Sequence, residues 1–182
     1  MVRAAVFTIE QTGQWLGSWT PWYGFVKAPA GATFRLAPGA RIAAQIYYRG
    51  GDETVVDRGT IGVTFADDRA TRDISDLVIM GEPTSRRATL RGRSRLGADT
   101  YFWALQPRIA PGLTSIQVSA RRPDGRTEIL LFARDISTEW PTPYLLDRPV
   151  LLPRGTELTV STHYANDPPA DRTLLIVSRY RG

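Results

Sequence analysis

The stretch LAPGARIAAQIYYRGGDETVVDRGTIGVTF, from Leu36 to Phe65, decides the fold predicted for this chain. It opens with a Pro-Gly pair, which is a turn dipeptide. Apolar side chains then alternate with other residues from Ile42 to Ile46, which is the period of a half-buried strand. The alternation returns from Ile61 to Phe65, after a run of glycines and charged residues. The stretch therefore predicts strand, turn and strand, a β-hairpin.

A similar pattern recurs near the C-terminus, between Leu152 and Val177. When Gly39 is matched to Gly155, Tyr47 falls on His163. A pattern that repeats within one chain predicts repeated structural units. We therefore expect two related β-units in tandem.

The rest of the chain also has the pattern of short strands and frequent turns. No segment keeps a 3.6-residue apolar period over three turns, as a helix would. We predict an all-β fold of two tandem antiparallel β-sandwich (jelly-roll-like) domains packed side by side. The charged run at residues 68–73 is the predicted linker, between a first and short unit at 1–67 and a second unit at 74–182.

Composition narrows the classes of function. The chain has 182 residues, a formal charge of +5 and no cysteine, which excludes disulfides, thiolate metal sites and cysteine nucleophiles. Lys27 is the only lysine, so almost all positive charge is arginine, which pairs well with carboxylate or phosphate. No apolar run approaches about 18 residues, so no transmembrane helix is predicted. The N-terminal MVRAAVFTIE is typical of a strand rather than a signal peptide.

Two segments are candidate partner-binding surfaces. The first is an aromatic loop that contains Trp15, Trp19, Trp22 and Tyr23. Exposed aromatic clusters bind sugars or protein partners, whereas buried ones plug the end of a β-sandwich. Both interpretations fit this loop.

The second segment is an arginine-rich run that contains Arg86, Arg87, Arg91, Arg93 and Arg95. It could grip phosphate or an acidic protein face, or form one solvated side of a strand. Nucleic acid is not the expected partner, because the run lacks the aromatic residues on which bases stack. An acidic protein partner or a membrane surface fits the charge better.

Catalytic residues are harder to assign. His163 is the only histidine, and the sequence assigns it no serine or carboxylate partner as a general base. The candidates for a pair of catalytic carboxylates are Asp57, Glu128, Glu139 and Asp171. Turn capping or local ion pairs explain these residues equally well, so no catalytic residue is predicted.

In the order of its landmarks, most of the chain resembles the copper type II, ascorbate-dependent monooxygenases, the peptidylglycine and dopamine hydroxylase group. Their fold, two eight-stranded jelly rolls side by side, is also that of peptide N-glycosidase F. The landmarks that carry the resemblance are Leu16 to Pro21, Leu36 to Phe65, Pro107 to Gly112, Pro123 to Leu131, Trp140 to Tyr144, and Leu152 to Thr156.

The chain departs from that family at the copper ligands, which are imidazoles and one thioether. The family's histidine pair on the first strand falls near Arg3-Ala4, and its His-x-His motif falls on Tyr47 and Arg49. The ligands of its copper loop fall on residues 108–110, Arg-Ile-Ala, and Met80 has no companion cluster. The resemblance thus implies the fold without the copper activity and without a cofactor.

We therefore expect a non-catalytic structural or accessory subunit. It would bind protein within a larger, membrane-associated bacterial complex, on the periplasmic or extracellular side. A cytoplasmic location is the alternative, because the sequence shows no signal peptide. The alternative functions are a carbohydrate- or glycan-binding or -processing module and a residual copper monooxygenase.

Overall fold

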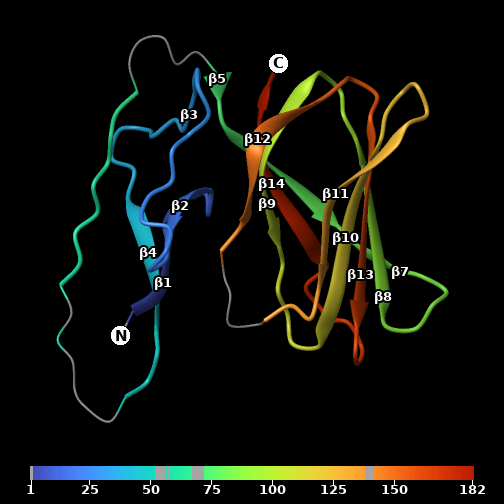
Figure 1. Ribbon diagram of the computed structural model, residues 1–182, viewed down its shortest axis with the longest axis horizontal. Helices are drawn as coiled ribbons and strands as arrows, with labels where there is room; N and C mark the ends of the chain where they lie inside the picture. Colours follow the sequence, from blue (N-terminus) through green and yellow to red (C-terminus); the bar gives the residue numbers. More distant parts are fainter. Residues whose placement is uncertain (1, 52–55, 57, 67–71, 138–141) are drawn as a thin grey trace. The chain divides into compact units, whose positions relative to one another are not determined.

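The structure is a computed structural model that describes residues 2–51, 56, 58–66, 72–137 and 142–182. Every regular element in these residues is a β-strand, so the predicted all-β class is confirmed (Figure 1). The chain divides into two compact units, residues 1–73 (unit 1) and 74–182 (unit 2).

Unit 1 has a small antiparallel sheet. Its strands are β1 (Val2–Ile9), β2 (Trp15–Trp19), β3 (Ala32–Thr33), β4 (Ile42–Tyr48) and β5 (Arg72–Asp73). Three of them form a sheet in the order β2-β1-β4, and the two-residue strands β3 and β5 pair in parallel. The central strand β1 buries Ala4, Val6 and Ile9. The Trp15 ring is also buried in this unit, 6.4 Å from the ring of Phe34.

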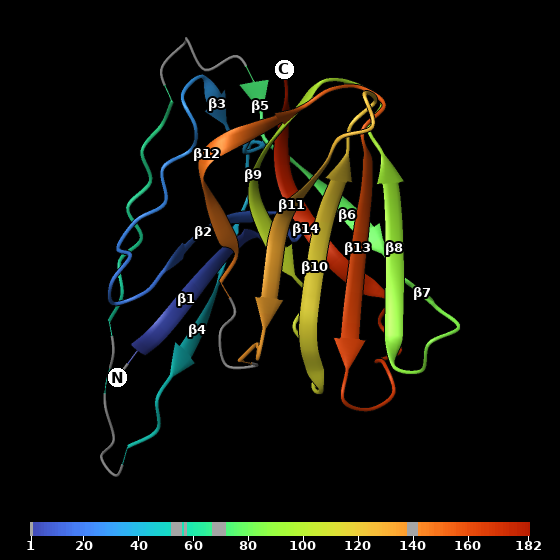
Figure 2. The ribbon, with the colours of Figure 1, turned by 45° about the vertical axis from the view of Figure 1, so that its right-hand side comes forward.

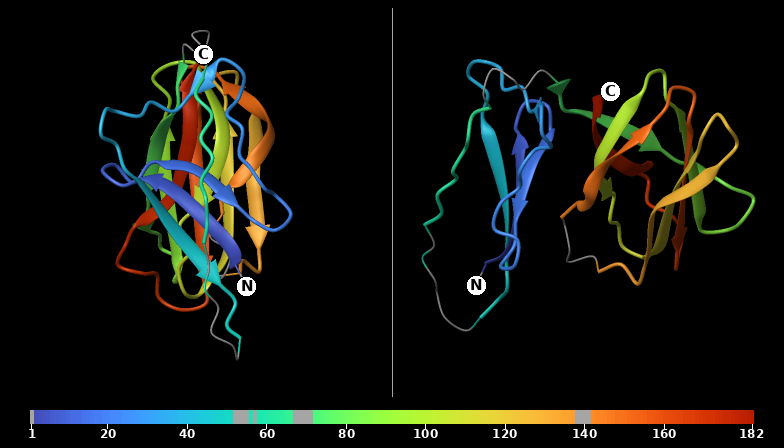
Figure 3. Two further views of the ribbon diagram at one scale, coloured as in Figure 1. Left: turned by 90° about the vertical axis from the view of Figure 1, so that its left-hand side faces the viewer. Right: turned by 45° about the horizontal axis from the view of Figure 1, so that its top comes forward.

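The hairpin predicted from Leu36 to Phe65 is wrong in its second half. β4 forms as expected, but it pairs with β1 and lies at the edge of the sheet. Residues 58–66 contain no strand, and Figures 1 and 3 show them running apart from β4. Gly62 weakens a strand at this point, and the apolar side chains of Ile61 and Phe65 are 45% and 85% exposed. Without a surface to bury them, alternation alone does not make a strand.

Unit 2 is a β-sandwich. Its strands are β6 (Ser75–Met80), β7 (Glu82–Pro83), β8 (Thr89–Arg95), β9 (Thr100–Pro107), β10 (Leu113–Arg121), β11 (Thr127–Arg134), β12 (Tyr144–Leu152), β13 (Glu157–Tyr164) and β14 (Thr173–Arg181). They form a five-stranded sheet, β11-β10-β13-β8-β7, and a four-stranded sheet, β12-β9-β14-β6. Figure 2 shows the strands β11, β10, β13 and β8 side by side.

The two sheets of unit 2 enclose one hydrophobic core. The five-stranded sheet contributes Leu90, Ile116 and Leu158, and the four-stranded sheet contributes Phe102 and residues of β14, all at most 1% exposed. Burial of apolar surface on this scale is the main stabilising term for such a domain. In β13, part of the repeat that the sequence shows near the C-terminus, buried residues alternate with outward ones, so the pattern there is the alternation between the core and solvent.

The turn between β10 and β11 forms where the Pro-Asp-Gly sequence predicts it. The Arg122 amide donates to the Arg126 carbonyl at 2.8 Å, which closes the turn. Gly125 has φ +85°, a conformation that glycine adopts without strain. This turn fixes the register between β10 and β11, and thereby which side chains face outward.

The other predicted boundaries are described only in part. Residues 68–71 of the predicted linker and residues 138–141, which include Trp140, lie outside the described residues. The last two residues of that linker, Arg72 and Asp73, form β5. Asp57 and Glu139, two of the candidate carboxylates, are also outside the described residues.

Candidate functional site

The side of the five-stranded sheet that faces away from the core, called here the outer face, is mostly polar, with Ile129 and Phe132 of β11 as exposed apolar side chains. Along β13 the buried residues Leu158, Val160 and Thr162 alternate with outward residues 157, 159, 161 and 163, which read Glu-Thr-Ser-His. In β8 the outward positions are 89, 91, 93 and 95, which read Thr-Arg-Arg-Arg. Because successive strand residues point to opposite faces, one side builds the core and the other presents hydroxyls and guanidinium groups.

The strand register arranges these outward residues in rows across the sheet. One row has Arg134, Ser115, His163 and Thr89 as successive neighbours on β11, β10, β13 and β8. The next row carries Phe132, Gln117, Ser161 and Arg91 on the same strands. Neighbouring strands lie about 4.8 Å apart, so each row spans about 14 Å.

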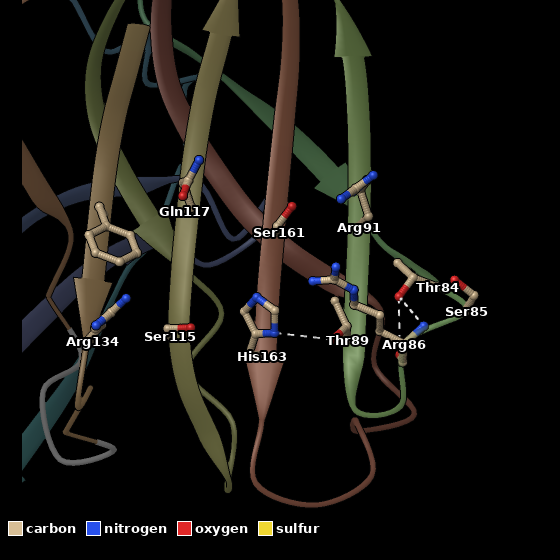
Figure 4. Close-up of a pocket in the computed structure, with 11 residues that line it drawn as sticks. Thr84, Ser85, Arg86, Thr89, Arg91, Ser115, Gln117, Arg134, Ser161 and His163 are labelled. Carbon is tan, nitrogen blue, oxygen red and sulfur yellow. Dashed lines mark hydrogen bonds between the residues drawn. The ribbon is translucent and has the colours of Figure 1, made fainter.

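These two rows form the floor of a pocket of about 590 Å³. The loop between β7 and β8 supplies one wall, and Figure 4 shows the residues that line the pocket. The lining consists of Thr84, Ser85, Arg86, Thr89, Arg91, Ser115, Gln117, Phe132, Arg134, Ser161 and His163. It contains three arginines and no carboxylate, so the pocket is positively charged.

Hydrogen bonds position the residues that line the pocket where β8 begins. His163 Nδ1 lies 3.2 Å from Thr89 Oγ1 (Figure 4). In the loop, the Arg86 amide donates to Thr84 Oγ1 at 3.1 Å. The same hydroxyl donates to the Arg86 carbonyl at 3.2 Å. These two contacts fix the backbone of Arg86, whose side chain extends across Thr89 toward His163 (Figure 4).

The arginines of the pocket differ from other arginines of unit 2 in their partners. Within the part of the chain that the structure describes, Arg86, Arg91 and Arg134 form no ion pair within 4.0 Å. By contrast, Arg108 pairs with Asp171 at 3.0 Å, and Arg122, Arg126 and Arg93 also have carboxylate partners. The pocket therefore gathers guanidinium groups whose charge the surrounding protein does not neutralise.

At the other end of the pocket a cation lies against an aromatic ring. The guanidinium carbon of Arg134 is 4.9 Å from the centre of the Phe132 ring, and that ring is half exposed. Contacts of this kind stabilise by about 0.5–1 kcal/mol at exposed sites. The contact orients the Arg134 side chain before any ligand arrives.

The predicted arginine segment is only partly gathered at this site. Arg86 and Arg91 line the pocket, and Arg93 and Arg95 continue along the outer face of β8. Arg93 is 4.0 Å from Glu157, with both side chains largely exposed. Arg87 turns away, because it pairs with Asp167 at 3.8 Å beside a separate hollow at residues 165–167.

The predicted aromatic loop has a buried first half and an exposed second half. Trp15 is only 2% exposed, and its indole Nε1 donates to Ser18 Oγ at 2.9 Å. The expectation that Trp15 contacts a partner is thus corrected, because its ring packs in the core of unit 1. Trp19 is half-buried in β2, whereas Trp22 and Tyr23 are 73% and 52% exposed. Only the second half of the loop presents aromatic rings to solvent.

Sequence reasoning missed most of the residues that complete the pocket, among them Ser115, Gln117, Phe132, Arg134 and Ser161. The pattern that could have found them is the polar alternation of β10 and β13, Ser-x-Gln and Ser-x-His. Each run is ordinary for a solvated strand. They become a site only when the register places them in adjacent rows.

Arg108, one of the positions that align with the copper ligands of the family, forms an ion pair. Arg108 donates from Nε to Asp171 Oδ2 at 3.0 Å. The pKa of Asp171 lies below its usual value, chiefly because the Thr173 amide donates to it and also because of Arg108. The described residues contain no group of three or more His, Asp or Glu side chains placed to hold a metal ion.

Two broader observations complete the description of the chain. No helix among the described residues is long and apolar enough to span a membrane. No protein-family model and no curated protein matches this chain.

Proposed function

We propose that this protein is a non-catalytic interaction module, and that unit 2 binds an acidic segment of a protein partner on the outer face of its five-stranded sheet. The observation that carries the proposal is the row of Arg91, Arg93 and Arg95 along one side of β8. Arg121 of β10 lies on the same face, beside Glu157. Among the described residues, the only acidic partners of these four arginines in the strand register are Glu157 and Glu82, so positive charge dominates this surface.

The spacing of these arginines suggests the form of the partner. Alternate residues of a strand lie about 6.6 Å apart, and an extended peptide has the same repeat. A peptide with a carboxylate at every second position could therefore place one against each of Arg91, Arg93 and Arg95. Guanidinium groups bind carboxylates in a bidentate manner, which favours such a match over a diffuse attraction.

The surroundings of His163 support a binding role over a catalytic one. Its Nδ1 lies against the hydroxyl of Thr89, whereas a hydrolytic triad needs a carboxylate there to orient the imidazole and stabilise its charged form. None of the residues that line the pocket is acidic. Serine and histidine are thus neighbours without the third member of a triad.

The wider setting of this module rests on the family resemblance alone. On that basis we propose an accessory subunit of a larger, membrane-associated complex on the periplasmic or extracellular side. Co-purification from its source, followed by identification of the bound chains by mass spectrometry, would test this setting. The binding proposal itself can be tested with purified components.

The test is a peptide-binding titration with the full chain. Two fluorescent nine-residue peptides of equal charge are compared, one with glutamate at every second position and one with the same glutamates in one block. We expect the alternating peptide to bind several-fold more tightly. The triple variant Arg93→Ala, Arg95→Ala, Arg121→Ala should weaken it by about tenfold, or about 1.4 kcal/mol. Added salt should weaken binding further, since exposed charges are screened.

The matched control is Arg148→Ala. Arg148 is in β12 of the other sheet, its side chain is 91% accessible, and it lies 3.8 Å from the equally exposed carboxylate of Asp147. Its removal lowers the total charge without touching the outer face. If Arg148→Ala weakens the peptide as much as a single substitution in β8 does, the attraction is a property of net charge and the proposed surface is wrong.

A second candidate is a glycan-binding module, favoured by one observation in unit 1. Trp22 and Phe25 are 73% and 75% exposed within four residues of each other, and exposed aromatic rings stack on sugars. Binding to a glycan array that is lost in Trp22→Ala, while the arginine variants bind normally, would favour this candidate over the first.

A further inference from the structure

We propose that the pocket at the start of β8 is a subsite for a phosphate monoester, the phosphoserine or phosphothreonine of the acidic partner segment. The inference rests on the proposed function, because it assigns a specific residue of that partner to a specific place on the outer face. The subsite consists of Arg86, Arg91, Thr89, Ser161 and His163.

The geometry of these residues suits a small anion. Thr89 is the cross-strand neighbour of His163, and Arg91 is the cross-strand neighbour of Ser161. Cross-strand neighbours lie about 5 Å apart and alternate residues of one strand about 7 Å apart. The four side chains thus rise from the corners of a small rectangle, and the Arg86 side chain extends over it from the loop (Figure 4).

The chemistry of the donors favours a phosphate over a carboxylate. A phosphate monoester presents three acceptor oxygens that point in different directions and carries nearly two charges at neutral pH. Two guanidinium groups from different elements, the Ser161 hydroxyl and the His163 imidazole can contact such a group from several sides. A carboxylate has two oxygens in one plane, which a single arginine satisfies.

The protein leaves the two guanidinium groups of the subsite available, whereas the Thr89 hydroxyl donates to the Arg87 carbonyl at 3.3 Å. In the described part of the chain, neither Arg86 nor Arg91 pairs with a carboxylate within 4.0 Å. Two unneutralised guanidinium groups that line one pocket repel each other, so an anion bound there relieves an unfavourable interaction as well as forming new ones. The nearest acidic residue across the strands is Glu82, opposite Arg91, and it does not line the pocket.

The size of the pocket indicates that more than the phosphate enters it. Its volume of about 590 Å³ is within the range of pockets that hold small organic ligands. The remaining lining, Ser115, Gln117, Phe132 and Arg134, extends across β10 and β11. We assign this half of the pocket to the residues that flank the phosphorylated one. Because these lining residues are arranged across β10 and β11, the flanking part of the peptide would cross those strands near the start of β8.

The experiment compares three nine-residue peptides with the full chain by fluorescence anisotropy. All have the alternating acidic sequence, and the central residue is serine, glutamate or phosphoserine. We expect the phosphoserine peptide to bind about tenfold or more tightly than the glutamate peptide, because charge-assisted bonds to the extra oxygens add to the affinity. Inorganic phosphate should compete with the phosphoserine peptide and should shift the NMR signals of His163 and Thr89.

Three variants separate the subsite from the rest of the face. Arg86→Gln and Arg91→Gln should each reduce the preference for phosphoserine over glutamate to about twofold or less. Arg95→Gln, on the same strand and face but outside the pocket, should weaken both peptides equally and leave the preference unchanged. Arg86 is exposed in a loop, so its replacement leaves the core intact.

The outcomes distinguish this inference from the proposed function. If the glutamate and phosphoserine peptides bind equally well and both depend on Arg95, the acidic-peptide surface is correct and the phosphate subsite is wrong. The subsite is equally wrong if the preference survives Arg86→Gln and Arg91→Gln. If a sulfated oligosaccharide displaces the phosphopeptide at lower concentration than the phosphopeptide itself binds, the ligand is a glycan and the assignment to a polypeptide is overturned.

Discussion

Replacing Gly92 with alanine should destabilise unit 2 more than any other single methyl group added to a strand of its five-stranded sheet. Gly92 faces the core from the middle of β8, close to the last two residues of β6, Ile79 and Met80. A Cβ atom added there would be 2.4 Å from the Met80 carbonyl oxygen and 2.8 Å from Ile79 Cγ2. Neither obstacle can move aside easily, because one is backbone and the other is a side chain only 1% exposed.

The magnitude follows from the displacement that the methyl group demands. Ordinary contact begins at 3.4 Å, so β8 and β6 must separate by about 1 Å at this point. Overpacking of a core usually costs about 1–3 kcal/mol, and a backbone obstacle places this substitution at about 3 kcal/mol or above. With a urea dependence of about 1–3 kcal/mol per molar, the midpoint should fall by about 1–3 M.

Hydrogen exchange in increasing urea, read by mass spectrometry, is the suitable assay. Tryptophan fluorescence mixes the two units, because Trp103 is in unit 2 and Trp15, Trp19 and Trp22 are in unit 1. Peptides from β8 and β13 report on unit 2 alone. The reference variant is Gly97→Ala, where a Cβ atom meets nothing within 4 Å and the effect should be neutral or slightly stabilising. Equal protection in the two variants would refute the close approach of β8 and β6.

Two further predictions concern the core and one carboxylate. Leu158→Ala should lower the free energy of unfolding of unit 2 by about 2–5 kcal/mol, since Leu158 is fully buried, whereas Ile129→Ala, at a site 62% exposed, should change it by less than about 0.5 kcal/mol in the same exchange assay. The Thr173 amide and Arg108 lower the folded-state pKa of Asp171. The ionised carboxylate therefore stabilises the fold above the unfolded-state pKa of about 3.9. That contribution is lost as the pH falls through the lower folded-state pKa. Asp171→Asn should therefore make stability fall less steeply below about pH 4. An NMR titration of the Asp171 carboxyl in the parent protein should give a midpoint below about 3.9. A midpoint at or above that value would contradict the contacts of Asp171 with Thr173 and Arg108.

The strands of unit 2 could be predicted from the sequence because their signals are local. In β13 buried residues alternate with outward polar residues, and the Pro-Asp-Gly turn fixes where β10 ends and β11 starts. The outward position of Arg91, Arg93 and Arg95 follows from the same period. These features depend on the residues next to each other in the chain.

The pocket and the missing strand could not be predicted, because both depend on pairings between distant residues. The pocket joins Arg86, Gln117, Arg134 and His163, and no local pattern states that β13 lies between β10 and β8. For Ile61–Phe65 the local pattern was strong, but the outcome depended on whether a partner surface existed. Apolar alternation shows which side chains a strand would bury, but it does not show whether another element packs against them.

The separation of roles between the two sides of the five-stranded sheet has a consequence for how this domain can be altered. Outward side chains of β8, β10 and β13 contribute little to the core, so the set of groups at positions 91, 117 and 161 can be exchanged while the buried residues between them stay constant. Unit 2 can therefore serve as a scaffold whose binding surface is changed by substitutions at outward positions alone. Libraries restricted to its outward positions should yield folded proteins with new ligand preferences.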